Sequence, residues 1–175
     1  MLTTERLTLR GWRDDDLDAY TALHADPHVA YWLGGRLTPE AAAASLQRNR
    51  EAFEAQGWGM YAIERTEDGA LLGLAGLMPV ADDIPVAPAV EASWRLSPAA
   101  WRQGYCTEAM RAILADAFGR GQEEIVSLTA AANQRSQAVV ERLGFTRDPA
   151  SDFDHPRLPP DHTLNRHVVY RLKRG

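Results

Sequence analysis

Residues 101–109 read Trp-Arg-Gln-Gly-Tyr-Cys-Thr-Glu-Ala and join a strand-like segment, 90–96, to a helix-like segment, 107–118. The first N–H groups of a helix have no acceptor within the helix, and the aligned peptide dipoles place partial positive charge there. Gly104 lets the backbone of this bend come close to a bound group. The segment therefore predicts a turn that holds a phosphate group through backbone amides.

A second helix follows this turn in the sequence. It opens with Asn133-Gln134-Arg135-Ser136 and runs into Gly144, and an apolar strand-like stretch, 124–130, precedes it. Strand, helix, strand and helix thus alternate over 90–143, which is the pattern of a parallel strand pair joined by a crossover helix.

Capping and alternation signals place the remaining elements. Thr38 is expected to cap a helix that has Pro39 at its first position and ends at Gly57. The other predicted segments are a strand at 6–12, a helix opened by the acidic turn 14–16, strands at 60–65 and 71–80, a loop at 81–88, a long surface loop at 148–162 and a last strand at 167–172. The acidic clusters Asp14–Asp16 and Asp82-Asp83 are expected to be solvated surface, and the alternative is that they attract a cationic acceptor.

Composition limits the class of protein. With 175 residues, 45% of them hydrophobic and 25% charged, the chain is predicted to be a single domain over 1–175. One cysteine excludes an intramolecular disulfide and fits a reducing compartment, and the first residues lack a secretory signal, so we expect a cytoplasmic protein. No apolar run suits a membrane span, and a net charge of −5 argues against nucleic acid as a partner.

These segments together resemble the GCN5-related N-acetyltransferase superfamily, in particular the subgroup typified by bacterial ribosomal-protein N-terminal acetyltransferases. The similarity is carried by Thr-Glu-Arg-Leu-Thr-Leu-Arg at 4–10, Glu-Ala-Ser-Trp-Arg-Leu at 91–96, Gly-Tyr-Cys-Thr-Glu-Ala at 104–109, and the helix at 133–145. The resemblance implies a mixed α/β (α+β) fold. Its central sheet would be mostly antiparallel, with a splayed parallel strand pair and flanking helices.

The resemblance also implies acetyl-CoA as the acyl donor. In the family, the bend binds the pyrophosphate of the donor, and the preceding strand hydrogen-bonds the pantetheine arm through its backbone. The residues of this chain that match those positions are Trp94, Arg95, Leu96, Arg102, Gln103, Gly104, Tyr105, Cys106 and Thr107, with Asn133 and Ser136 on the second helix.

The chain departs from the family pattern at three positions of the bend. Trp101 stands at its first position, Arg102 at a position that is commonly glycine, and Cys106 at the final small position. Arg102 either adds a cation near a phosphate or crowds the amides. The tyrosine that often acts as the acid in this family falls on Val140, so that route to protonating the thiolate is absent.

Acetyl transfer needs a neutral amine, a positioned thioester and a proton source for the departing thiolate. The resemblance makes Glu91 the candidate base, and the alternative is a carboxylate that orients substrate or forms a structural ion pair. Ser136 lies one helical turn after Asn133 and is the candidate acid, while Asn133 is a candidate contact to CoA. Both residues could instead be ordinary helix caps.

Neither an acyl-cysteine intermediate nor a metal site is favoured. Cys106 lacks a visible Cys-His pairing, and a small side chain there is enough to let a phosphate approach. Pro27 separates His24 from His28, and the remaining histidines, His155, His162 and His167, have no compact ligand spacing. We expect surface or loop histidines and no metal.

The predicted function is therefore an acetyl-CoA-dependent N-acetyltransferase. The acceptor would be a primary amine, either a protein N-terminus or a small molecule, which attacks directly in a ternary complex. The alternative is a noncatalytic acyl-CoA-binding or sensor module. A P-loop hydrolase is discounted because no Gly-Lys-Ser/Thr follows the bend. The oligomeric state is open, although the edge of the late strand can pair two copies into a homodimer.

Overall fold

The computed structural model describes residues 1–175, which divide into two compact units. Unit 1 comprises residues 1–77 and 93–113, and unit 2 comprises residues 78–92 and 114–175. Three elements, β4 (Leu71–Pro79), β5 (Val90–Leu96) and α4 (Tyr105–Gly119), contribute residues to both units. The single domain expected from the sequence stays a prediction.

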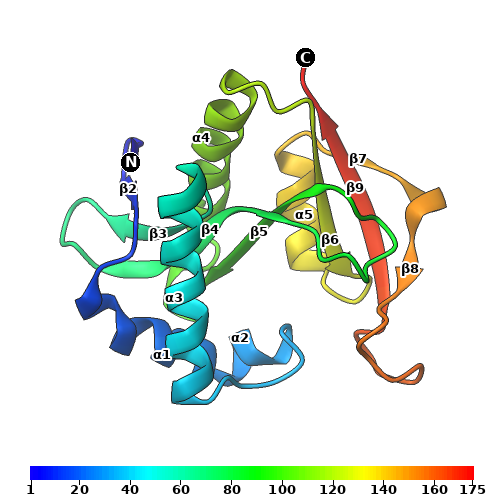
Figure 1. Ribbon diagram of the computed structural model, residues 1–175, viewed down its shortest axis with the longest axis horizontal. Coiled ribbons are helices and arrows are strands. Elements are labelled where there is room, and N and C mark those ends of the chain that lie inside the picture. The colour runs from blue at the N-terminus through cyan, green and yellow to red at the C-terminus, as the bar shows by residue number, and fades with distance from the viewer. The chain divides into compact units, whose positions relative to one another are not determined.

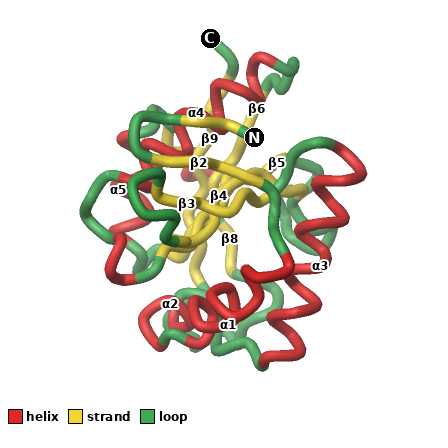
Figure 2. The backbone as a smooth tube through the Cα atoms, turned by 90° about the vertical axis from the view of Figure 1, so that its left-hand side faces the viewer, coloured by secondary structure: helices red, strands yellow, loops and turns green.

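Unit 1 is built on antiparallel strands with helices packed beside them (Figure 2). Its further elements are β1 (Leu2–Thr3), β2 (Leu7–Arg10), the 3-10 turn η1 (Asp14–Asp16), α1 (Leu17–Ala25), α2 (Pro27–Tyr31), α3 (Pro39–Gln56), β3 (Met60–Arg65) and the 3-10 turn η2 (Pro98–Ala100). Leu9 lies opposite Ile63 and Met60 lies opposite Gly76, so β2, β3 and β4 are consecutive neighbours. None of the helices of the chain is long and apolar enough to cross a lipid bilayer.

Helix α3 forms where its capping residues predict it. The Thr38 side chain accepts a hydrogen bond from the Ala41 N–H at 3.2 Å, and Gly57 ends the helix with φ 73°. Helices α1 and α3 lie side by side (Figure 1) and cover an apolar core. This core contains Trp12, Tyr20, Leu23, Val29, Ala42, Leu46, Met60, Ala62 and Leu74.

Unit 2 contains the predicted parallel pair. Its further elements are β6 (Glu124–Ala130), α5 (Gln134–Arg142), β7 (Thr146–Arg147), the 3-10 turn η3 (Pro149–Ser151), β8 (Phe153–Asp154) and β9 (Arg166–Lys173). Strand β5 pairs with β6 in parallel, with Glu91 opposite Val126. Strand β9 is antiparallel to β6, and β7 and β8 pair with β9. The mixed, mostly antiparallel sheet with one parallel pair and flanking helices confirms the predicted fold class.

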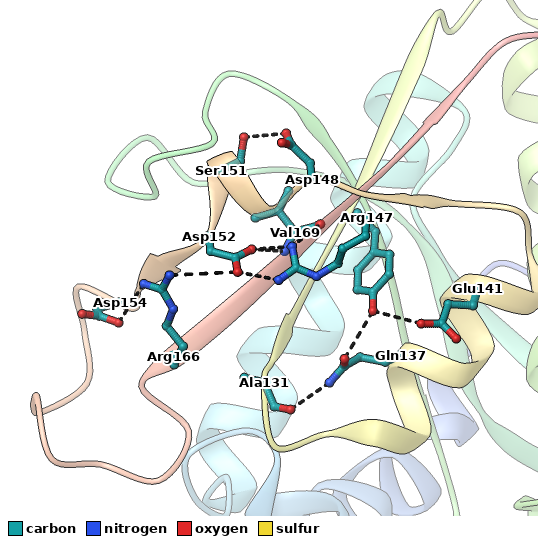
Figure 3. A network of polar contacts seen from close by, with 11 residues as sticks. Ala131, Gln137, Glu141, Arg147, Asp148, Ser151, Asp152, Asp154, Arg166 and Val169 are labelled. Carbon is teal, nitrogen blue, oxygen red and sulfur yellow. Dashed lines mark hydrogen bonds and ion pairs between the residues drawn. The ribbon is translucent and has the colours of Figure 1, made fainter.

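The segment 148–162 contains short regular elements, whereas the sequence predicted a long surface loop. It contains η3 and β8, and Asp152 forms a bidentate ion pair with Arg147 (Figure 3). Oδ1 of Asp152 also accepts a hydrogen bond from the Val169 N–H at 3.2 Å. These partners lie on β7 and β9, so a local reading of prolines and aspartates could not reveal them.

Candidate functional site

The predicted phosphate-binding turn lies in unit 1 at the start of α4. The helix begins at Tyr105, and its first backbone hydrogen bond runs from the Glu108 N–H to the Gly104 carbonyl at 3.0 Å. Gly104 has φ 82°, in the left-handed region that favours glycine. Residues 102–104 are exposed. The sequence thus produces three exposed residues directly before a helix N-terminus, which is an arrangement suited to binding an anion.

The side chains of this turn mostly point to protein partners. The Gln103 side-chain amide donates to the Ala99 carbonyl at 2.5 Å, Tyr105 and Thr107 are buried, and Cys106 is half-buried. We infer that any contact of the turn with a phosphate is made chiefly by its backbone.

Arg102 is the one residue other than glycine with a positive φ, at 60°. The left-handed conformation costs an L-residue roughly 1–2 kcal/mol. We expect Arg102→Gly to be neutral or to raise the free energy of unfolding by up to about 1 kcal/mol, because relief of this strain outweighs the added freedom of the unfolded chain.

Arg102→Ala is the matched control, since it also removes the guanidinium but keeps a Cβ in the strained conformation. Urea unfolding of the three proteins measures the effect. An alanine variant as stable as the glycine variant would show that φ at this position carries no cost.

A hydrogen bond from Trp101 connects the turn to the end of strand β5. The indole Nε1 of Trp101 donates to the carbonyl of Leu96 at 2.8 Å. Trp94 and Arg95 are half-buried, and Leu96 is buried. Within unit 1, the structure therefore connects the two predicted donor-binding segments, 94–96 and 102–107, through the aromatic residue at the first position of the bend.

His24 is a buried residue of unit 1, contrary to the expectation of surface or loop histidines. Its Nδ1 lies 2.8 Å from the Tyr20 carbonyl and its Nε2 lies 3.2 Å from Nη1 of Arg95. A carbonyl only accepts, so Nδ1 carries the proton and Nε2 accepts from the guanidinium. Burial lowers the pKa of His24, and the charge of Arg95 lowers it further despite the favourable Tyr20 contact.

The low pKa of His24 predicts a loss of stability in acid. In the unfolded chain His24 protonates below a pKa of about 6.5, whereas the folded protein holds it neutral. The free energy of unfolding should therefore fall as the pH drops below about 6.5, with a limit for this residue of about 1.4 kcal/mol per pH unit.

Urea unfolding at several pH values between 7.5 and 5.5, comparing the wild type with His24→Gln, tests this expectation. The wild type should lose stability more steeply than the variant, because the variant cannot bind the proton. Parallel curves would contradict it.

Unit 2 carries the candidate catalytic residues. Glu91 is half-buried on β5, opposite Val126 of β6. The Asn133 side-chain oxygen accepts a hydrogen bond from the Ser136 N–H at 3.2 Å and so caps α5. This cap uses only Oδ1 of Asn133, and the Asn133 amide group and the Ser136 hydroxyl are separate donors. The roles of Glu91, Asn133 and Ser136 stay predictions.

Val140 lies one turn after Ser136 on α5 and is fully buried. A residue at this position contributes to the core, which fits the apolar side chain found where the family often has a tyrosine.

Two of the three late histidines, His155 and His167, lie close together although their spacing in the sequence is not compact. The rings of His155 and His167 have centroids 4.9 Å apart, and Phe153 stacks on His167 at 5.4 Å. Burial lowers the pKa of both imidazoles. The strand pairing of β8 with β9 brings them together across the intervening segment, which sequence spacing does not reveal.

Three residues around the turn were not assigned a role from the sequence. A cluster of hydrogen bonds joins Thr4 and Arg6 to Glu108. Arg6 and Glu108 are 102 positions apart in the sequence. The signals were the segments 4–10 and 104–109, which contribute to the family resemblance without indicating what their polar residues contact.

Comparison with known proteins identifies the family of the chain. The family model of the acetyltransferase (GNAT) domain matches residues 6–146. The chain is 24% identical over 151 residues to the uncharacterized N-acetyltransferase YoaA of Bacillus subtilis (strain 168). The aligned region covers 85% of this chain and 84% of that protein. A crystal structure of an acetyltransferase from Agrobacterium tumefaciens str. C58 has a TM-score of 0.78 at 29% identity, over 98% of this chain and 92% of that chain.

A further similar structure is that of RimL, a ribosomal L7/L12 alpha-N-protein acetyltransferase in complex with coenzyme A. It has a TM-score of 0.78 at 18% identity and covers 97% of this chain and 95% of that chain, a likeness of fold. The fold and these relatives define an acyltransferase. The chain belongs to the GNAT family of acetyltransferases.

Proposed function

We propose that the protein transfers an acetyl group from acetyl-CoA to a primary amine. The observation that supports this most directly is the exposed turn at residues 102–104, which precedes the N-terminus of α4 in a chain of the GNAT family. The backbone of 102–107 would hold the pyrophosphate, and the end of β5, 94–96, would hold the pantetheine arm.

The reaction is a direct attack in a ternary complex. The nitrogen of the neutral amine forms a bond to the thioester carbonyl carbon, and the carbon–sulfur bond breaks. Glu91 takes one proton from the ammonium group before the attack, directly or through water. The Ser136 hydroxyl then donates a proton to the CoA thiolate and regains one that the new amide nitrogen releases. Asn133 contacts the donor. Much of the acceleration comes from holding the two substrates together, so few side chains are needed.

The acceptor is either a protein N-terminal α-amine or a small-molecule amine. The fold likeness to RimL, whose name gives a ribosomal protein N-terminus as its substrate, supports testing peptides first. A noncatalytic acyl-CoA-binding or sensor module is the second candidate, and Val140 in place of a tyrosine acid favours it.

Calorimetric titration with acetyl-CoA, followed by thiol release against N-terminal peptides and polyamines, separates these functions. Binding together with thiol release for one acceptor class is the expected result. Binding without release for any amine would favour the sensor, and absence of binding would overturn the donor assignment.

Glu91→Gln should reduce kcat by about a hundredfold, the lower range for removal of a general base, while leaving the Kd for acetyl-CoA unchanged. Steady-state thiol release measures kcat, and calorimetric titration measures the Kd.

The matched control is Glu123→Gln, which makes the same change in unit 2 at an exposed carboxylate that pairs with Arg174 at 3.3 Å. If Glu91→Gln retained the wild-type rate, Glu91 would not be the base.

A further inference from the structure

A dense set of contacts joins the N-terminal segment to the first turn of α4 within unit 1. Oε1 of Glu108 accepts hydrogen bonds from the Thr4 hydroxyl at 2.6 Å and from the Arg6 backbone N–H at 2.9 Å. Oε2 of Glu108 lies 2.7 Å from Nε and 2.6 Å from Nη2 of Arg6. Two nitrogens of the Arg6 guanidinium thus contact the same oxygen of Glu108, and this ion pair with two contacts restricts the orientation of the guanidinium.

The same guanidinium contacts the backbone of the turn. Nη1 of Arg6 donates to the Gln103 carbonyl at 3.0 Å, and the guanidinium carbon lies 4.4 Å from the centre of the Tyr105 ring. A Cβ placed on Gly104 would lie 3.4 Å from Nη2. Arg6 thus lies against three consecutive residues of the turn, Gln103, Gly104 and Tyr105.

The contact with the Gln103 carbonyl sets the direction of the next amide. The peptide bond between Gln103 and Gly104 is trans, because the only cis bond of the chain joins Ala87 and Pro88. In a trans peptide, the carbonyl and the following N–H point in opposite directions. Because Arg6 holds the carbonyl on its own side, the Gly104 N–H points away from Arg6, toward the other side of the turn.

Glu108 creates an electrostatic problem for a phosphate at this turn. Burial raises the pKa of Glu108, but the bonds from Thr4 and from the Arg6 backbone and side chain outweigh burial and lower the pKa below its usual value. Glu108 is therefore a carboxylate in the first turn of α4. Such a charge stabilises the helix start but repels a phosphate bound there. The paired guanidinium of Arg6 cancels this repulsion.

We propose that Arg6 is a positioning residue for the pyrophosphate of the acyl donor: it orients the Gln103–Gly104 peptide and neutralises Glu108. This inference rests on the proposed function, since it assigns how the donor-binding turn of that function is held. Arg6 acts through the turn and through Glu108. Its effect should therefore depend on whether the donor has a pyrophosphate.

The test compares Arg6→Gln, Glu108→Gln and the double variant with the wild type. Arg6→Gln should weaken CoA binding in calorimetry about tenfold, as expected for one charged interaction near an anion. The double variant should recover to within about threefold of the wild type, because the unpaired carboxylate is gone. The loss in Arg6→Gln should shrink at high salt, since the Arg6 side chain is 41% exposed.

A substrate without a pyrophosphate distinguishes an effect of Arg6 on pyrophosphate binding from an effect on the stability of the fold. Arg6→Gln should raise the KM for acetyl-CoA about tenfold and leave kcat/KM for S-acetyl-pantetheine within about twofold of the wild type. A merely structural role of Arg6 would lower kcat/KM for both substrates. If Arg6→Gln does not fold, Arg6→Lys, which keeps the charge but lacks the guanidinium fork, should give a smaller loss of the same kind.

The outcomes distinguish the two proposals. A wild-type protein that does not bind CoA would overturn the proposed function and this inference with it. A wild-type protein that binds CoA, with folded Arg6→Gln binding equally well, would overturn only the inference. So would equal losses for acetyl-CoA and S-acetyl-pantetheine.

Discussion

Arg10→Met is expected to lower the free energy of unfolding by about 3 kcal/mol or more, the cost of leaving a buried charge without its partner. Nη1 and Nη2 of Arg10 contact the two oxygens of Asp16 at 2.7 and 2.8 Å, and Nε contacts Glu64 at 2.6 Å. The Arg10 side chain is only 8% exposed and that of Asp16 only 7%. Methionine fills the volume but leaves the Asp16 carboxylate without its strongest donor.

Two further variants identify the cause. Arg65→Met removes a bidentate arginine–carboxylate pair of the same kind, with Asp68, from a more exposed place and should cost much less. The double variant Arg10→Met/Asp16→Leu should recover most of the stability that Arg10→Met loses, because the buried Asp16 carboxylate is gone and Glu64 keeps its contact with Arg13 at 3.2 Å. Urea unfolding measures all three. Equal losses for Arg10→Met and Arg65→Met would contradict the assignment of the effect to burial.

Local signals in the sequence predicted the elements that depend on local chemistry. Thr38 and Gly57 bound α3 as expected, since capping involves residues close in the sequence. Strands β3, β5 and β6 have the predicted limits, 60–65, 90–96 and 124–130. The acidic turn 14–16 was predicted, but as solvated surface. The structure instead buries Asp16 against Arg10, a partner that the acidic cluster itself does not indicate.

The same division holds for the candidate site. The turn at 102–107 could be predicted because a glycine beside a helix start is a local pattern. The residues that hold it could not, since Arg6 and Glu108 are 102 positions apart. The contact between His24 and Arg95 spans 71 positions and depends on how α1 meets β5. Such contacts follow from tertiary packing, and single-sequence spacing contains no information on them.

Gly73→Ala in β4 is expected to lower the free energy of unfolding by about 4 kcal/mol or to prevent folding, as for other severe steric conflicts. A Cβ on Gly73 would lie 2.1 Å from the Arg95 carbonyl oxygen and 2.7 Å from the Leu96 Cα. Both atoms belong to backbone, so no side-chain rotation can relieve the conflict. The φ of Gly73, 150°, adds strain for an L-residue.

Gly69→Ala is the matched control, because Gly69 also has a positive φ, 72°, but a Cβ there would meet no atom within 4 Å. It should cost about 1 kcal/mol, the contribution of the backbone conformation alone. The difference between the two variants in urea unfolding, or in soluble yield if Gly73→Ala does not fold, isolates the steric term. Similar values for both would mean that β4 and β5 can separate at little cost. In that case the strand end at 94–96 would not be held rigidly enough to orient a pantetheine arm through its backbone.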